Sequence, residues 1–100
     1  MIQHIVYFKL KPSVTPEKLD EMIIETRIRL LKIQGVTNLK VGKNVDEKSP
    51  WQFFLSLDLE SMERLELYRD DPIHIKYVEQ IIKPNTDDRM AQDFDIGARK

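Results

Sequence analysis

Residues 2–10 read IQHIVYFKL, and this stretch decides the fold. β-branched and aromatic residues dominate it, which is typical of a β-strand. Successive side chains of a strand point to opposite faces. Apolar groups occupy both of these faces: the even positions include His4, Val6 and Phe8, and the odd positions include Ile5 and Tyr7. We therefore expect a strand that is covered on both sides, with a contiguous apolar patch marking an interface.

The next three segments predict a helix and a hairpin. Thr15 is a good N-cap, and apolar residues recur at helical spacing over 16–33, before Gly35 ends the helix. Residues 36–45 and 51–59 favour strands, and the turn-forming residues between them indicate a β-hairpin.

The second half of the chain predicts a broken helix and a last strand. Ser61 caps a helix, and Asp71-Pro72 interrupts it because the residue before a proline avoids the α region. Asp71 then caps a new helix. Residues 89–96 form the last strand, and 97–100 are expected to be a frayed tail. The predicted fold class is α+β: a ferredoxin-like β-α-β-β-α-β chain, with a four-stranded antiparallel sheet and two helices on one face.

Composition narrows the class of protein. One hundred residues predict a single domain over 1–100, and dimerisation is one way for such a short chain to bury more apolar surface. A net charge of −1 argues against a nucleic-acid protein, which would carry a basic stripe. No apolar run is long enough to cross a membrane, and the first residues do not read as a signal peptide, so a cytoplasmic location is expected. The absence of cysteine excludes disulfides and thiolate metal sites.

Five fragments of the sequence, in this order, resemble one known family. They are residues 4–12, 41–44, 58–61, 68–74 and 93–94. Together they are similar to the stress-responsive A/B barrel domain family, the dimeric α/β barrel proteins, over nearly the whole chain. The resemblance implies a homodimer in which two sheets face each other, with a small apolar cavity between sheet and helices in each subunit. Most members of that family have no established activity.

One member of the family is a plant polyketide cyclase. In it, a tyrosine and a histidine across a proline-containing helix break act as an acid–base pair, and the resemblance places them on Tyr68 and His74. A pocket histidine falls on His4, whereas another pocket histidine falls near Phe53. The apolar wall of the last strand is replaced here by Arg89, Ala91 and Asp93.

The candidate site residues each have a functional and a structural interpretation. His74 lies near the start of a helix, whose dipole should lower its pKa and leave a neutral general base beside Tyr68. Alternatively, His74 fills the gap between sheet and helix and bonds a backbone carbonyl. His4 is either a pocket residue or a satisfied core histidine. A metal site formed by the two histidines and Asp93 is not expected, because their separation in sequence gives no ligand motif.

Three functions remain open from the sequence. The first is a dimeric stress-type domain that binds a small apolar molecule in a pocket formed by His4, Val6, Phe8, Phe53 and Val78. The second is a cofactor-independent enzyme acting on a small carbonyl compound with His74 and Tyr68, and the third is a cofactor-free monooxygenase. An open cavity that reaches His74 would favour a binder or an enzyme. A cavity filled by Phe8, Phe53 and Val78 would favour a structural role.

Overall fold

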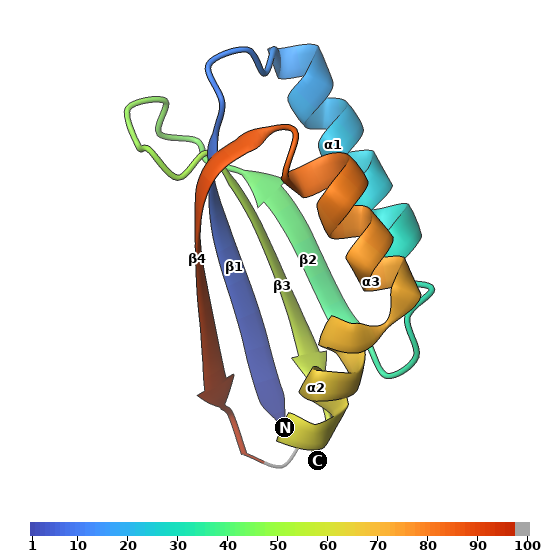
Figure 1. The fold of residues 1–100 in the computed structure, drawn as a ribbon. Coiled ribbons are helices and arrows are strands. Elements are labelled where there is room, and N and C mark those ends of the chain that lie inside the picture. Colours follow the sequence, from blue (N-terminus) through green and yellow to red (C-terminus); the bar gives the residue numbers. More distant parts are fainter. Residues whose placement is uncertain (98–100) are drawn as a thin grey trace.

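The computed structural model describes residues 1–97 and has the predicted β-α-β-β-α-β order (Figure 1). Its elements are β1 (Ile2–Leu10), α1 (Pro16–Leu30), β2 (Thr37–Lys43), β3 (Phe53–Leu59), α2 (Met62–Asp70), α3 (Pro72–Tyr77), the π-helical segment η1 (Val78–Ile82) and β4 (Thr86–Asp95). The predicted frayed tail falls largely on residues 98–100, which lie outside the described residues.

The four strands form one antiparallel sheet in the order β2-β3-β1-β4. The helices lie on one side of this sheet, and β4 forms the edge furthest from β2 (Figure 1). Residues paired across neighbouring strands share a face, so His4 lies on the same face as its partners Leu57 on β3 and Asp93 on β4. This helix-facing side therefore holds both the core and the predicted site residues.

Two predicted element boundaries are wrong by three residues. Helix α1 ends at Leu30 rather than at residue 33, and a turn closed by Gly35 at φ +91 follows it. Strand β4 begins at Thr86 rather than at residue 89, because Leu10 of β1 pairs with Thr86 and extends the ladder. Tertiary pairing here outweighs the low strand propensity of the Asp87-Asp88 segment.

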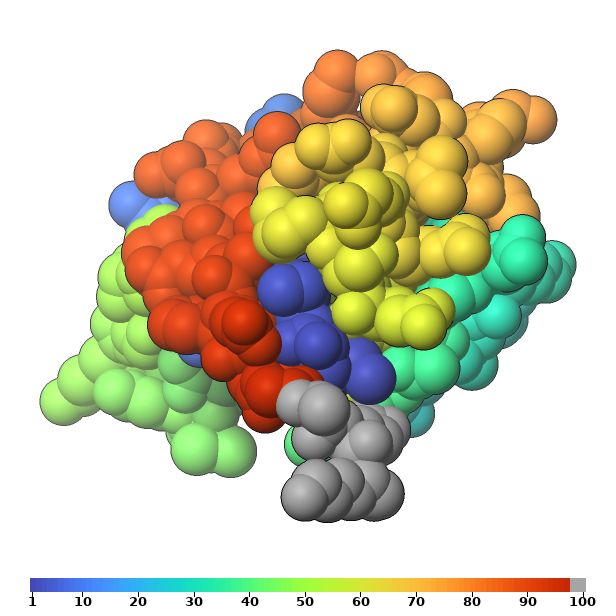
Figure 2. Space-filling model, turned by 90° about the horizontal axis from the view of Figure 1, so that it is seen from below, coloured from blue at the N-terminus to red at the C-terminus, as the bar shows by residue number. Residues whose placement is uncertain are grey.

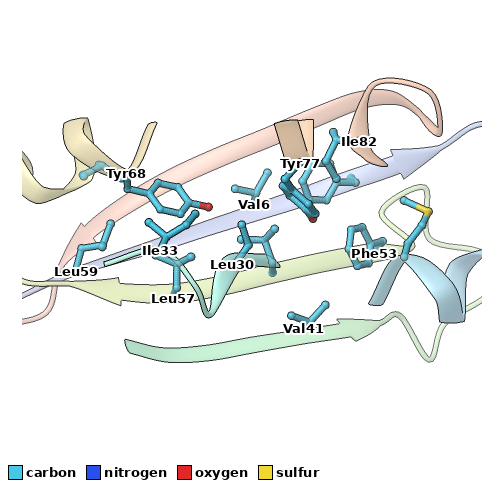
Figure 3. Close-up of a cluster of buried hydrophobic side chains, with 14 residues drawn as sticks. Val6, Leu30, Ile33, Val41, Phe53, Leu57, Leu59, Tyr68, Tyr77 and Ile82 are labelled. Atoms are coloured by element: carbon cyan, nitrogen blue, oxygen red, sulfur yellow. The ribbon is translucent and has the colours of Figure 1, made fainter. Parts of the chain in front are cut away.

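The core lies between the helices and β3 (Figure 3). On α1, Met22, Thr26 and Leu30 are buried at the predicted helical spacing. On β3, the odd positions are buried beneath the helices, and Leu57 and Leu59 are completely inaccessible to solvent. These alternating and helical periodicities are the features that the sequence predicted most directly.

The predicted break before Pro72 is present. Asp71 adopts an extended conformation, with φ −62 and ψ 131, and separates α2 from α3. Its carboxylate caps the second helix, because Oδ1 accepts a hydrogen bond of 2.8 Å from the amide of Ile73. The π-helical turn η1 then follows α3, a local geometry that often occurs at functional sites.

The other face of the sheet carries no helix (Figure 1). Tyr7 on β1 stacks on Phe54 of β3, with ring centroids 6.5 Å apart. On β4, Met90 and Phe94 share this face and are substantially exposed. Apolar side chains thus lie on both faces of β1, as its two-sided pattern predicted, and on β4 the polar Gln92 lies between Met90 and Phe94. Among the described residues, no helix has the length and apolar character needed to span a membrane.

Candidate functional site

A cavity of about 500 Å³ lies on the helix-facing side of the sheet, bordered by β1, β4, α2, α3 and η1. Of the residues predicted to form the site, it is lined by His4, Val6, Phe8, Tyr68, His74 and Val78. Strand β4 contributes Arg89 and Ala91 to its wall. The cavity is therefore open rather than filled by its aromatic and aliphatic neighbours, and it reaches His74.

Phe53 does not line this cavity. Its ring lies behind Phe8, with centroids 5.2 Å apart, and only 1% of Phe53 is exposed. Phe53 therefore supports the wall rather than forming it. Trp51 borders a separate hollow on the opposite side of the sheet.

His74 is held by its backbone surroundings. Its Nδ1 lies 3.1 Å from the carbonyl oxygen of Arg69. A carbonyl can only accept, so Nδ1 donates, and in the neutral ring the free lone pair is on Nε2. The two interpretations of His74 are thus combined: the ring bonds a backbone carbonyl through one nitrogen and borders the cavity as well.

The pKa of His74 is lowered from its ordinary value, in the predicted direction but for a different first reason. Burial of the ring is the largest cause, rather than the dipole of α3, which has only six residues. Electrostatic interactions with His4 and Arg89 lower the pKa of His74 further, whereas the Arg69 carbonyl and the Asp71 carboxylate raise it. Neutral His74 is the form that the fold favours.

Tyr68 is deeply buried at the cavity, with 2% of its surface exposed. Figure 3 shows its ring pointing inward from α2, towards the side of β1 that carries Val6. Burial raises the pKa of Tyr68, and the neighbouring Tyr77 raises it further, so the phenol stays protonated and can donate. Within residues 1–97, the Tyr68 hydroxyl has no hydrogen-bond partner.

The rings of Tyr68, His74 and His4 meet. The Tyr68 centroid is 4.5 Å from that of His74, at a tilt of 46°, and 5.6 Å from that of His4 in an edge-on contact. No hydrogen bond joins Tyr68 to His74 in the part of the chain that the structure describes, so their contact is between rings.

Figure 2 views the end of the molecule where β1 begins, and the first residues of the chain lie there between β4 and α2.

The orientation of His4 is fixed by the carboxylate of Asp93, a contact that the sequence did not predict. Its Nδ1 lies 2.6 Å from Oδ1 of Asp93, and Oδ2 of Asp93 lies 3.3 Å from the guanidinium of Arg69. Since a carboxylate only accepts, Nδ1 of His4 donates to it, which fixes the ring orientation. Within residues 1–97, no group of three His, Asp or Glu side chains is arranged to hold a metal ion.

Tyr77 also lines the cavity and was not predicted to do so. Its hydroxyl is 2.7 Å from Oγ1 of Thr26 on α1, and both residues are buried. The available signal was its position three residues after His74, which places both on one side of a helix. Because its hydroxyl is already bonded to Thr26, Tyr77 acts as a wall of the cavity.

Solved structures with the same fold cover nearly the whole chain. A dabb family protein with a ferredoxin-like fold from Mesorhizobium loti is 22% identical to this chain, with a TM-score of 0.84 and 97% of each chain covered. A dimeric ferredoxin-like protein of unknown function from Thermobifida fusca is 26% identical, with a TM-score of 0.82, over 93% of this chain and 88% of that one. A hydroxynitrile lyase from Passiflora edulis is 12% identical, with a TM-score of 0.82, over 99% of this chain and 95% of that one.

Among curated proteins, none matches this chain. The family model of the stress responsive A/B barrel domain matches residues 2–96. That match spans all four strands and every helix, including the residues around the cavity. The chain therefore belongs to the stress responsive A/B barrel domain family.

Proposed function

We propose that this protein binds a small, largely apolar molecule that carries a hydrogen-bond acceptor, in the cavity beside His74. The observation that carries this proposal is the Tyr68 hydroxyl, which belongs to a largely buried residue of the cavity lining and makes no hydrogen bond within residues 1–97. A phenol donates one hydrogen bond, and a ligand acceptor in the cavity would receive it. The volume of about 500 Å³ is in the range of ligand pockets, roughly 300–1,000 Å³.

The lining supports a ligand with one polar end. Val6, Ala91 and Val78 offer apolar contact, while Tyr68 and His74 bring a donor and an acceptor close together. This distribution matches the general pattern of pockets in which apolar walls supply affinity and a few polar groups fix orientation. A carbonyl compound is the simplest ligand with that pattern.

Acid–base chemistry on such a carbonyl compound is the second candidate function. The neutral form of His74, which the fold favours, supports it. A neutral ring that donates through Nδ1 keeps its Nε2 lone pair for a proton. The Tyr68 phenol would donate to the carbonyl oxygen while His74 removes a proton from the adjacent carbon. The resulting enolate would be stabilised by the same donor.

The activities of structural relatives do not decide between these candidates. The hydroxynitrile lyase and a putative antibiotic biosynthesis monooxygenase from Nitrosomonas europaea are 12% and 14% identical to this chain. At such identities the likeness extends to the fold alone. The proposal accordingly depends on the residues of this cavity.

Deletion of one hydroxyl tests the proposal. Binding of an uncharged aryl ketone such as 4-phenyl-2-butanone is measured by isothermal titration calorimetry at pH 7.5. Tyr68→Phe should weaken binding about fivefold, since a hydrogen bond contributes on the order of 1 kcal/mol. It should leave folding intact, because the hydroxyl has no partner within residues 1–97.

Tyr77→Phe is the matched control. It removes a hydroxyl that is bonded to Thr26, so it should lower stability and leave affinity unchanged. Equal affinities for the wild type and Tyr68→Phe would contradict the assigned role of Tyr68. Absence of any measurable binding would contradict the pocket itself.

We also propose that the free face of the sheet is the interface of a homodimer. Ile5, Tyr7, Phe54, Met90 and Phe94 form its apolar surface. Structural relatives from Thermobifida fusca and Bacteroides fragilis are described as dimeric. Sedimentation at micromolar concentration should give twice the chain mass of 11.9 kDa. Tyr7→Asp should produce monomers, because it would bury an unpaired charge, and a monomeric wild type would refute the dimer.

A further inference from the structure

We propose that the ligand is an organic acid, with its apolar body in the cavity and its carboxylate held by Arg89. This inference rests on the proposed function, and it adds the chemical class of the ligand. Arg89 stands where the family resemblance implies an apolar wall residue, and the fold places it in the lining of the cavity.

Arg89 stands on the correct side of the sheet. It pairs with Phe8 of β1, so it shares the helix-facing side with Phe8 and Ala91. All three residues line the cavity. Arg89 belongs to the edge strand β4 and is itself exposed, so this part of the cavity wall also contacts solvent. A charged ligand group placed there would keep partial hydration while the rest of the ligand is buried.

The other basic side chains at the cavity already have acidic partners. The guanidinium of Arg69 is 3.3 Å from Asp93, and the amine of Lys83 is 2.7 Å from Glu79. Arg89 has no carboxylate within ion-pair distance in residues 1–97; Asp88 bonds its backbone amide at 2.8 Å. Among the described residues that line the cavity, Arg89 is thus the one cation without an ion pair.

The guanidinium also acts on the proposed chemistry. The charge of Arg89 lowers the pKa of His74, so the two groups are within electrostatic reach across the same cavity. A carboxylate bound by Arg89 would therefore place the adjoining carbon skeleton near His74 and Tyr68. An acid bound in this way is oriented by its charge at one end and by the Tyr68 hydroxyl further in.

A carboxylate fits this site better than a phosphate. The planar fork of arginine matches a carboxylate in a two-bond contact. A phosphate dianion would have to be held by the same single guanidinium. It would also approach the carboxylates of Glu79 and Asp93, which lie at or beside the cavity. One unpaired cation accordingly selects a ligand with one negative charge.

Paired probes test this inference on the full-length protein. The affinities of 3-phenylpropanoate and its uncharged amide, 3-phenylpropanamide, are measured by calorimetry at pH 7.5. The acid should bind at least tenfold more tightly, because charge-assisted hydrogen bonds are about twice as strong as neutral ones. Arg89→Gln should abolish this preference and leave the affinity for the amide unchanged. Lys32→Gln, which removes an equal charge at an exposed position outside the cavity, should retain the preference.

Each other outcome has a distinct meaning. Equal binding of acid and amide by the wild type overturns the acid inference and leaves the proposed pocket standing. A preference that persists in Arg89→Gln overturns the assignment to Arg89. Absence of binding by both probes and by the aryl ketone overturns the proposed function together with the inference that rests on it.

Discussion

The two halves of the sheet differ in how they meet the helices. Near α1, the side chains of Leu30, Leu57 and Leu59 are completely buried and form a packed core (Figure 3). At the β1–β4 edge, the same face of the same sheet borders a cavity of about 500 Å³. One half therefore contributes mainly to stability, and the other leaves room for a ligand.

The difference arises from the side chains of β4. Val6 of β1 pairs with Ala91, which is too small to fill the space that a larger residue would occupy. On either side of Ala91, Arg89 and Asp93 bring charged groups that cannot be buried without partners. The helix-facing side of the sheet is therefore not closely packed at β4. There, Asp93 bonds His4 and forms an ion pair with Arg69.

The largest expected effect distinguishes the two halves by a matched pair on β3. Leu57→Ala should lower the free energy of unfolding by about 3 kcal/mol, within the range of roughly 2–5 kcal/mol for leucine deletions in packed cores. Leu55→Ala should cost about 1 kcal/mol less, because Leu55 also borders the existing cavity. Urea unfolding of both variants measures the difference. Equal losses would show that the two halves are packed alike.

A smaller effect is expected at the junction between α2 and α3. Asp71→Ala should lower the free energy of unfolding by about 1 kcal/mol, because it removes the cap on the amide of Ile73. Asp71→Asn keeps a capping oxygen and should cost much less. If urea unfolding finds Asp71→Ala as stable as the wild type, the break does not depend on this cap.

The smallest effect concerns the charge of His74. Its pKa in the folded protein should lie below the value of about 6.5 in the unfolded chain, as an NMR titration would measure. Between these two values the unfolded chain binds more protons, so the free energy of unfolding rises with pH. The contribution of His74 should thus be fully present above about pH 6.5 and decline as the pH falls towards the folded pKa.

His74→Gln is the variant that isolates this effect. It should remove part of the difference between urea unfolding at pH 7.5 and at pH 5.5, because glutamine does not titrate. Arg89→Gln should raise the pKa of His74, since the Arg89 charge lowers it, and Asp71→Asn should lower that pKa further. A pKa at or above 6.5 in the wild type would contradict the burial argument.

Much of the fold could be predicted from local sequence. The alternation in residues 2–10 placed His4, Val6 and Phe8 on one face, and the structure buries all three. The Asp71-Pro72 pair determined the helix break and its cap, because proline restricts the residue before it. Such features depend on backbone geometry and on periodicity within a few residues.

The family resemblance, rather than periodicity, brought Tyr68 and His74 together as a candidate pair. It also placed Phe53 in the pocket, where the structure instead has Phe53 packed behind Phe8. An alignment gives the strand and the face of a residue. How far its side chain reaches depends on the neighbours that fill the space around it.

The remaining features were decided by tertiary structure alone. Asp93 bonds His4 across 89 positions of sequence, and Arg89 lies open to the cavity while Arg69 and Lys83 are paired. Strand β4 could begin at Thr86 because β1 offered an unpaired edge to it. The sequence determined which face each residue occupies, since that follows from local geometry. Only the pairing of β4 with β1 and the packing of α3 determined which charges meet and where the cavity stays open, because these contacts join segments far apart in the chain.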